Sequence, residues 1–155
     1  PWGPMGKHAV VRITPAEKAS SKLYSIVKAL GGQNDLEDLG LGGIFSYPKP
    51  VDLVKTLVAS QTFFDPEAIV LDFFAGSGTT AQAVMAANQR DEGSRKFILA
   101  QTPEPLRAKN ARSLVDAASD DGFLEISRLT AERIRRAAKR HAPGLTFTEI
   151  TVAEE

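Results

Sequence analysis

Residues 68–80 read AIVLDFFAGSGTT, and this stretch decides the fold. The apolar run over residues 68–74 contains a single acid, which is the pattern of a strand buried on both faces of a parallel sheet. The glycine-rich turn that follows leads into a helix of small residues over about 79–88, and residues 96–101 (KFILAQ) form a second strand of the buried type. Strand, helix and strand at this spacing predict a βαβ unit and therefore an α/β fold.

The glycine turn has the composition of an anion-binding loop. Gly76 and Gly78 permit backbone angles and close approaches that a side chain would forbid. The amides of residues 77–80 then point out of a helix N-terminus, where the helix dipole favours a carboxylate or a phosphate. Hydroxyl donors that can also cap the helix are supplied by Ser77, Thr79 and Thr80.

The turn alone leaves three interpretations open. A phosphate-binding P-loop requires a Lys after its last glycine, and none follows Gly78. A dinucleotide fingerprint GxGxxG/A fits residues 76–81 formally, but the next strand ends in Gln101 rather than in the acid that holds a ribose. A tight strand-to-helix turn without a ligand is the third interpretation.

The rest of the chain is expected to surround this unit with helices. Residues 1–7 are typical of a loop and residues 8–13 of a short strand, and a helix capped at Thr14 is expected to end at Gly31 and Gly32. Residues 33–43 are expected to be a polar, glycine-rich connection. Further helices are predicted over 51–60 and 124–140, and a third strand over 145–152. The inward residues expected in these helices are Leu23, Ile26, Val27, Leu30, Leu53, Val54, Leu57, Val58, Ile126, Leu129, Ile134 and Ala137.

The bulk composition excludes several classes of protein. Lys plus Arg and Asp plus Glu number 19 each, so no overall positive charge favours nucleic acid. The chain has no cysteine, and its two histidines, His8 and His141, lie far apart, so we expect no metal site and a reducing, cytoplasmic setting. No apolar run approaches the roughly 20 residues that span a bilayer, so we expect no membrane partner. Because the chain begins with Pro1, we expect it to be part of a longer gene product.

Two other groups of residues favour structural roles. The helix over 124–140 is basic, and we interpret this charge as a solvated face rather than a phosphate-binding surface. Its cations are Arg128, Arg133, Arg135, Arg136, Lys139 and Arg140. The aromatic pairs at residues 63–64 and 73–74 are expected mainly in the core, and His141 is expected at a helix end.

A wider set of motifs resembles the carboxyl-terminal part of DNA amino-methyltransferases in which the cofactor motifs come last. The likeness is to the modification subunits of type III restriction-modification systems. Four segments carry it in family order, over about two-thirds of the chain. They are residues 45–50 (FSYPKP), 70–80 (VLDFFAGSGTT), 88–105 (NQRDEGSRKFILAQTPEP) and 122–136 (GFLEISRLTAERIRR).

The resemblance implies a partial Rossmann-like sheet that binds S-adenosylmethionine, with about three parallel strands and a helical N-terminal lead-in. The backbone of residues 73–78 would hold the methionine part, Thr79, Thr80 and Lys49 would help with its carboxylate, and one ring of the second Phe pair could border the adenine. Gln101 falls where related enzymes often have an acid for the ribose, and a neutral Gln hydrogen-bonds a hydroxyl less strongly than an ionised acceptor does. The full expected set is Phe45, Pro48, Lys49, Pro50, Asp72, Phe73, Phe74, Ala75, Gly76, Ser77, Gly78, Thr79, Thr80 and Gln101.

The catalytic tetrapeptide of that family, Asp/Asn-Pro-Pro-Tyr/Phe/Trp, is absent from this sequence, so no catalytic residue is assigned. We therefore expect residues 1–43 to lead in from a target-recognition region and residues 44–155 to bind the cofactor of an adenine-N6 DNA methyltransferase. Its partners would be DNA and a restriction subunit. A second hypothesis is a non-catalytic remnant that completes its sheet with a second copy or another chain. A nicotinamide-binding Rossmann module is the weaker alternative.

Overall fold

A computed structural model of the 155-residue chain describes residues 2–5, 9–12, 26–106 and 125–152. Its parallel sheet is a strand pair, formed by β3 (Ile69–Asp72) and β4 (Lys96–Leu99) and connected through helix α3 (Thr79–Asp91). Ile69 pairs with Lys96 and Asp72 pairs with Leu99, so both strands end at the same edge. The predicted βαβ unit and the α/β class are confirmed.

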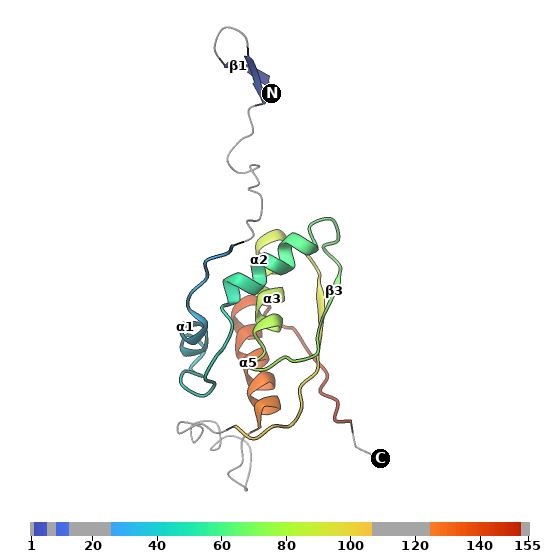
Figure 1. Ribbon diagram of the computed structural model, residues 1–155. Helices are drawn as coiled ribbons and strands as arrows, with labels where there is room; N and C mark the ends of the chain where they lie inside the picture. Colours follow the sequence, from blue (N-terminus) through green and yellow to red (C-terminus); the bar gives the residue numbers. More distant parts are fainter. Residues whose placement is uncertain (1, 6–8, 13–25, 107–124, 153–155) are drawn as a thin grey trace.

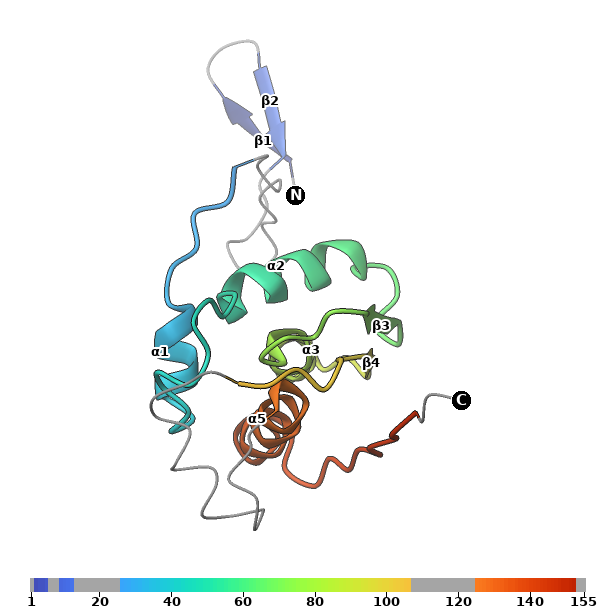
Figure 2. The ribbon, with the colours of Figure 1, turned by 60° about the horizontal axis from the view of Figure 1, so that its bottom comes forward.

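Helix α3 lies in the middle of the molecule. Figure 2 shows it between α2 (Val51–Gln61) on one side and α5 (Ile126–His141) on the other, with β3 and β4 beside it. The small side chains of α3 let its neighbours approach closely, and seven of its residues are buried. The main core cluster joins α3 and α5 to the segment before α2, and comprises Leu36, Leu39, Leu41, Ile44, Ala81, Met85, Leu129, Ile134, Ala137 and Ala138.

A buried arginine, Arg95, stabilises the end of the βαβ unit opposite the glycine turn. Arg95 directly precedes β4 and is 5% exposed. Its guanidinium donates to the Asp91 carboxylate at 2.8 and 2.9 Å and to the hydroxyl of Thr62, just past α2, at 2.5 Å. The Asn88 side chain bonds the Arg95 backbone at both its N–H and its carbonyl. This cluster ties the ends of α2 and α3 to the start of β4.

The strands are buried on one face only, so the prediction of burial on both faces is wrong for the described residues. Val70 and Phe97 face the helices, whereas Ile69, Leu71 and Ile98 are 63%, 49% and 54% exposed. The helices that pack on the sheet all lie on one side of it (Figure 1). The sequences of β3 and β4 do not alternate between apolar and polar residues, because both the covered and the exposed face carry apolar side chains.

The predicted third strand over residues 145–152 is also wrong. These residues form no strand, and no sheet of the described residues has more than two members. Of the apolar residues in this segment, Phe147 lies against the core cluster and 5.4 Å from the Arg135 guanidinium, whereas Leu145, Ile150 and Val152 are exposed. The expected sheet of about three parallel strands is therefore a pair in the part of the chain that the structure describes.

The N-terminal expectations were partly wrong. The predicted strand is confirmed as β2 (Ala9–Arg12), but it pairs antiparallel with β1 (Trp2–Met5), where a loop was expected. Ladder bonds to β2 evidently outweigh the poor strand propensity of the Gly and Pro in β1. The helix expected from Thr14 lies largely outside the described residues, and its described end at residues 26–30 is not helical.

The segment expected to be a polar connection contributes to the core instead. Gly31, with φ 105°, begins the short helix α1 (Gly32–Glu37) rather than ending an earlier one. Three leucines spaced along residues 36–41 are buried in the main core cluster with Ile44. The functional division between residues 1–43 and 44–155 stays a prediction.

The other helices follow the sequence closely. Helices α2, α3 and α5 begin or end within about three residues of their predicted bounds, and His141 is the last residue of α5 as expected. In α2, Val58 is buried but Leu57 is 43% exposed, so the expected inward stripe is narrower than predicted. No helix among the described residues has the length and apolar character needed to cross a membrane.

Candidate functional site

The site is the turn that joins β3 to α3 at the carboxyl edge of the parallel pair. Gly76 (φ 52°) and Gly78 (φ 79°) both have left-handed backbone conformations, which only glycine adopts without strain. The turn is closed by a hydrogen bond of 2.8 Å from the Gly78 amide to the Ala75 carbonyl, and the Ala75 amide donates to Ala100 at the end of β4. Thr79 and Thr80 then open α3, where the first amides of a helix have no partner within it.

Asp72, at the end of β3, braces this turn from within. One carboxylate oxygen accepts from the Phe74 amide at 3.0 Å, and the other accepts from the Thr80 hydroxyl at 2.6 Å. Both ends of the turn are therefore held by the same side chain. The Asp72 carboxylate therefore has a structural role, because it holds the loop in shape whether or not a ligand binds.

Gln101 holds the opposite side of the glycine turn. Its side-chain oxygen accepts from the Gly76 amide at 2.7 Å, and its amide nitrogen donates to the Thr102 carbonyl at 3.0 Å. The residue expected to contact a ribose thus holds the loop in this structure. The ribose contact stays a prediction.

Helix α5 forms the floor of the turn. The Thr130 hydroxyl donates to the Gly76 carbonyl at 2.5 Å. A Cβ added at Gly78 would lie 3.1 Å from the Thr130 methyl and 3.3 Å from its carbonyl oxygen. Gly78 is therefore needed for two reasons, its backbone angle and the closeness of α5.

One turn further along α5, a buried cation reaches the same loop. Arg133 is 0% exposed, and its guanidinium donates to the hydroxyls of Ser77 and Thr79 at 2.8 and 2.9 Å. Its Nε donates to the Gln82 side chain at 2.8 Å. Burial lowers the pKa of Arg133 to about 10, so it remains protonated at neutral pH. The interpretation of Arg133 as part of a solvated basic face is wrong.

The segment at residues 45–50 lies directly beside the glycine turn. The Thr79 hydroxyl is 3.3 Å from the Lys49 carbonyl, and the nearest atom to a Cβ at Gly76 would be the Phe45 ring, at 3.5 Å. Gln33 donates to the Phe45 carbonyl at 2.7 Å, which ties this segment to α1. Two motifs about thirty residues apart in sequence are thus brought to one place.

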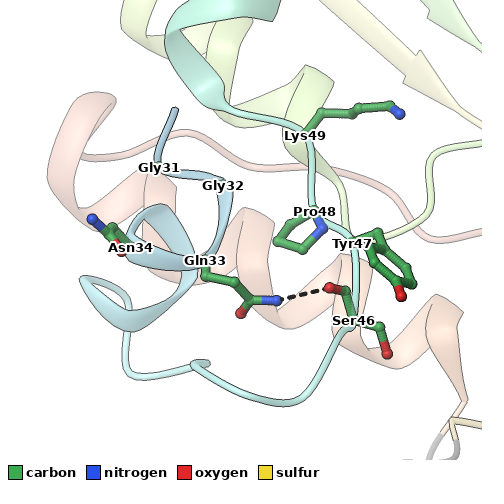
Figure 3. A pocket seen from close by; sticks show the side chains of 8 residues that line it. All are labelled: Gly31, Gly32, Gln33, Asn34, Ser46, Tyr47, Pro48 and Lys49. Carbon is green, nitrogen blue, oxygen red and sulfur yellow. Dashed lines mark hydrogen bonds between the residues drawn. The ribbon is translucent and has the colours of Figure 1, made fainter. Parts of the chain in front are cut away.

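An open pocket of about 440 Å³ adjoins this segment. Figure 3 shows Gln33 reaching from α1 towards Ser46 on one side of it, while Lys49 is directed away from both. The other lining residues are Gly31, Gly32, Asn34, Tyr47 and Pro48. Within this lining, Gly32 packs closely against the Pro48 backbone, because a Cβ added at Gly32 would overlap the Pro48 carbonyl.

The expected site residues divide into buried and exposed groups. Ser77 and Thr79 are 3% and 5% exposed and direct their hydroxyls to Arg133. Lys49, Phe73 and Phe74 are exposed, so the prediction that the aromatic pairs belong to the core is wrong. The rings at residues 63–64 stack edge to face, with centroids 4.9 Å apart, outside the core.

Sequence reasoning missed Thr130, Arg133 and Gln82 as parts of the site. One signal was available: Arg133 falls on the same helical stripe as Leu129 and Ala137, where an apolar residue is expected. A charged residue at such a position is buried only with polar partners, which the glycine turn supplies. No cluster of potential metal ligands is found among the described residues.

The fold and the turn together define a class: α/β proteins with a glycine-rich turn at the carboxyl ends of parallel strands, leading into a helix N-terminus. A family model described as DNA methylase matches residues 9–104. The chain therefore belongs to the DNA methylase family.

Similar proteins lie within restriction-modification systems. The chain is 38% identical over 109 residues to the type III enzyme StyLTI Mod subunit of Salmonella typhimurium, covering 70% of this chain and 16% of that one. It is 42% identical over 107 residues to the EcoPI Mod subunit of Escherichia phage P1, covering 68% and 15%. The type II methyltransferase M.KpnI of Klebsiella pneumoniae is 34% identical over 119 residues, covering 77% and 26%. The chain thus spans between 15% and 26% of the length of these relatives.

Proposed function

We propose that this chain is the cofactor-binding part of a site-specific DNA methyltransferase that transfers methyl from S-adenosylmethionine to adenine N6. The observation that supports this most strongly is the packing of the segment at residues 45–50 against the turn at Gly76 and Gly78. Membership of the DNA methylase family and similarity to Mod subunits support the reaction class.

The described residues fit such a cofactor chemically. The two glycines let the turn pack closely between Phe45 and Thr130, and the N-terminus of α3 offers amides and a positive dipole to a carboxylate. Lys49 is exposed beside the turn and can add a cation for that carboxylate. Phe73 and Phe74, 66% and 89% exposed, offer an apolar border for the adenine. When bound, S-adenosylmethionine supplies an electrophilic methyl group.

The chain's own residues position a ligand but provide no group for the target base. The family's catalytic tetrapeptide does not occur in this sequence. We therefore propose that the chain alone binds cofactor weakly and methylates nothing. DNA, and a restriction subunit where one exists, would be partners of the longer enzyme.

Calorimetric titration of the chain with S-adenosylhomocysteine, S-adenosylmethionine and NAD tests this proposal. We expect weak binding of the first two and none of NAD. Lys49→Ala should weaken binding about tenfold, the size of one lost charge-assisted hydrogen bond. Lys96→Ala is the matched control, since Lys96 is also exposed but stands at the start of β4, and it should change nothing. Tight NAD binding without S-adenosylmethionine binding, or methylation of DNA by the chain alone, would contradict the proposal.

A second candidate function is a docking module without catalysis. The uncovered apolar face of the sheet, with Ile69, Leu71 and Ile98, favours it, because such a face is normally covered. In this case the chain would associate with itself or with a chain that supplies further strands. Light scattering discriminates, since a monomer that stays dispersed at high concentration argues against association.

A further inference from the structure

Arg133 occupies an unusual position for a charged residue. It is the largest of the fully buried side chains and lies on the core-facing stripe of α5, between Leu129 and Ala137. An arginine chosen only for packing would be replaceable there by a methionine or leucine. Its polar contacts therefore need a separate explanation.

All of these contacts are made to the glycine turn and the first turns of α3. One guanidinium nitrogen holds both the Ser77 and Thr79 hydroxyls and lies 3.4 Å from the Ser77 carbonyl. The Nε is held by Gln82. The hydroxyls of Ser77 and Thr79 thus accept from α5. The Gly76 and Gly78 amides already donate within the protein, so the amides that open α3 are the donors left for a ligand.

The charge of Arg133 has no counter-ion in the part of the chain that the structure describes. Its partners are neutral oxygens, and its Nη2 is buried without any hydrogen-bond partner there. Asp35 is near enough only for a long-range attraction, and its carboxylate already accepts from the Val51 amide. The positive end of the α3 dipole lies at the same place, so both charges favour an anion at the turn.

We infer that Arg133 is a positioning residue that makes the turn selective for a carboxylate-bearing ligand. It holds Ser77 and Thr79 inward and leaves, behind the α3 N-terminus, a positive charge that has no counter-ion among the described residues. This inference rests on the proposed function, since the carboxylate would be that of the cofactor's methionine part. The residue acts through the loop and through its charge, without touching the ligand.

The sharpest perturbation is Gln82→Glu, which keeps the shape and the acceptor but places a carboxylate 2.8 Å from the Arg133 Nε. The guanidinium holds the new carboxylate ionised and is itself neutralised. The readout is the ratio of the dissociation constants of decarboxylated S-adenosylhomocysteine and S-adenosylhomocysteine, measured by calorimetry. We expect this ratio to fall about tenfold, as for a unit charge roughly 10 Å from the carboxylate at an effective dielectric constant of about 20. Gln61→Glu, an equal change of net charge at the exposed end of α2, should leave the ratio unchanged.

Two variants of Arg133 itself separate charge from packing. Arg133→Lys keeps the charge, and its ratio should stay within about threefold of wild type. Arg133→Met fills the space without charge and should lose the preference for S-adenosylhomocysteine over its decarboxylated form. An unchanged ratio in Gln82→Glu overturns the inference, whether or not Arg133→Met folds. If wild type binds S-adenosylhomocysteine but the ratio is insensitive to Gln82→Glu, only this inference fails. If wild type binds neither ligand, the proposed function fails with it.

Discussion

The closeness of α5 to the glycine turn can be measured by replacing Gly78 with alanine. Gly78 has φ 79°, and a left-handed conformation costs a residue with a Cβ about 1–2 kcal/mol. The new Cβ would also lie 3.3 Å from the Thr130 carbonyl and 3.1 Å from its methyl. Backbone gives way less easily than a flexible side chain, and overpacking of this kind costs about 1–3 kcal/mol. We expect a total loss of about 2–5 kcal/mol in the free energy of unfolding.

Gly144→Ala is the matched control. Gly144 has φ 93°, but nothing lies within 4 Å of a Cβ added there. Its substitution should therefore cost only the backbone strain, about 1–2 kcal/mol. Urea unfolding followed by far-ultraviolet circular dichroism gives both values, and a slope of about 2 kcal/mol/M would move the Gly78→Ala midpoint by about 1–2.5 M. Equal losses in the two variants would refute the packing of α5 beneath the turn.

Three further substitutions test other parts of the structure. Arg95→Met removes the buried clamp at the start of β4 and should cost about 3 kcal/mol in urea unfolding, whereas Arg90→Ala, exposed on α3, should change stability by less than about 0.5 kcal/mol. Gly32→Ala places a Cβ on the Pro48 carbonyl and should destabilise the chain by about 3 kcal/mol or more, so a stable variant would refute that contact. Burial first, and then the neighbouring Arg140 and Lys55 charges, lower the pKa of His141.

The sign of the His141 effect follows from proton binding. With a lowered folded pKa, the unfolded chain binds more protons below about pH 6.5, so stability falls as the pH drops through that value. His141→Gln should flatten the dependence of melting temperature on pH between about pH 7.5 and pH 5. If the melting temperature of His141→Gln varies with pH as steeply as that of wild type, other titratable groups cause the pH dependence.

The sequence predicted the βαβ unit well because local signals agreed there: an apolar run, paired glycines and a helix of small residues. It failed where two different structures share one pattern. The alternation at residues 145–152 matches a strand, yet the segment has no strand partner among the described residues and only Phe147 packs against the core. The apolar run of β3 predicted burial on both faces, but burial depends on what covers the sheet, which a strand's own sequence does not encode.

The loop residues of the site were predictable and their partners were not. Gly76 and Gly78 could be recognised from their residue type and spacing alone, and so could the hydroxyl residues beside them. Arg133 lies more than fifty residues away in sequence from the groups it binds, and its stripe position was concealed by five other cations on the same helix. Gln101 was predicted for the ligand but bonds the Gly76 amide, an outcome that only the turn geometry decides.

Amide chemical shifts of the isotope-labelled chain, followed during titration with S-adenosylhomocysteine, test the central claim most directly. The account predicts that the largest changes fall on the amides of Gly76, Gly78 and Thr80 and on those of residues 45–50. The amide chemical shifts of residues 92–95, at the opposite end of the βαβ unit, should not change. No response at the glycine turn, or a response centred elsewhere, would contradict the assignment of this turn as a methyl-donor site.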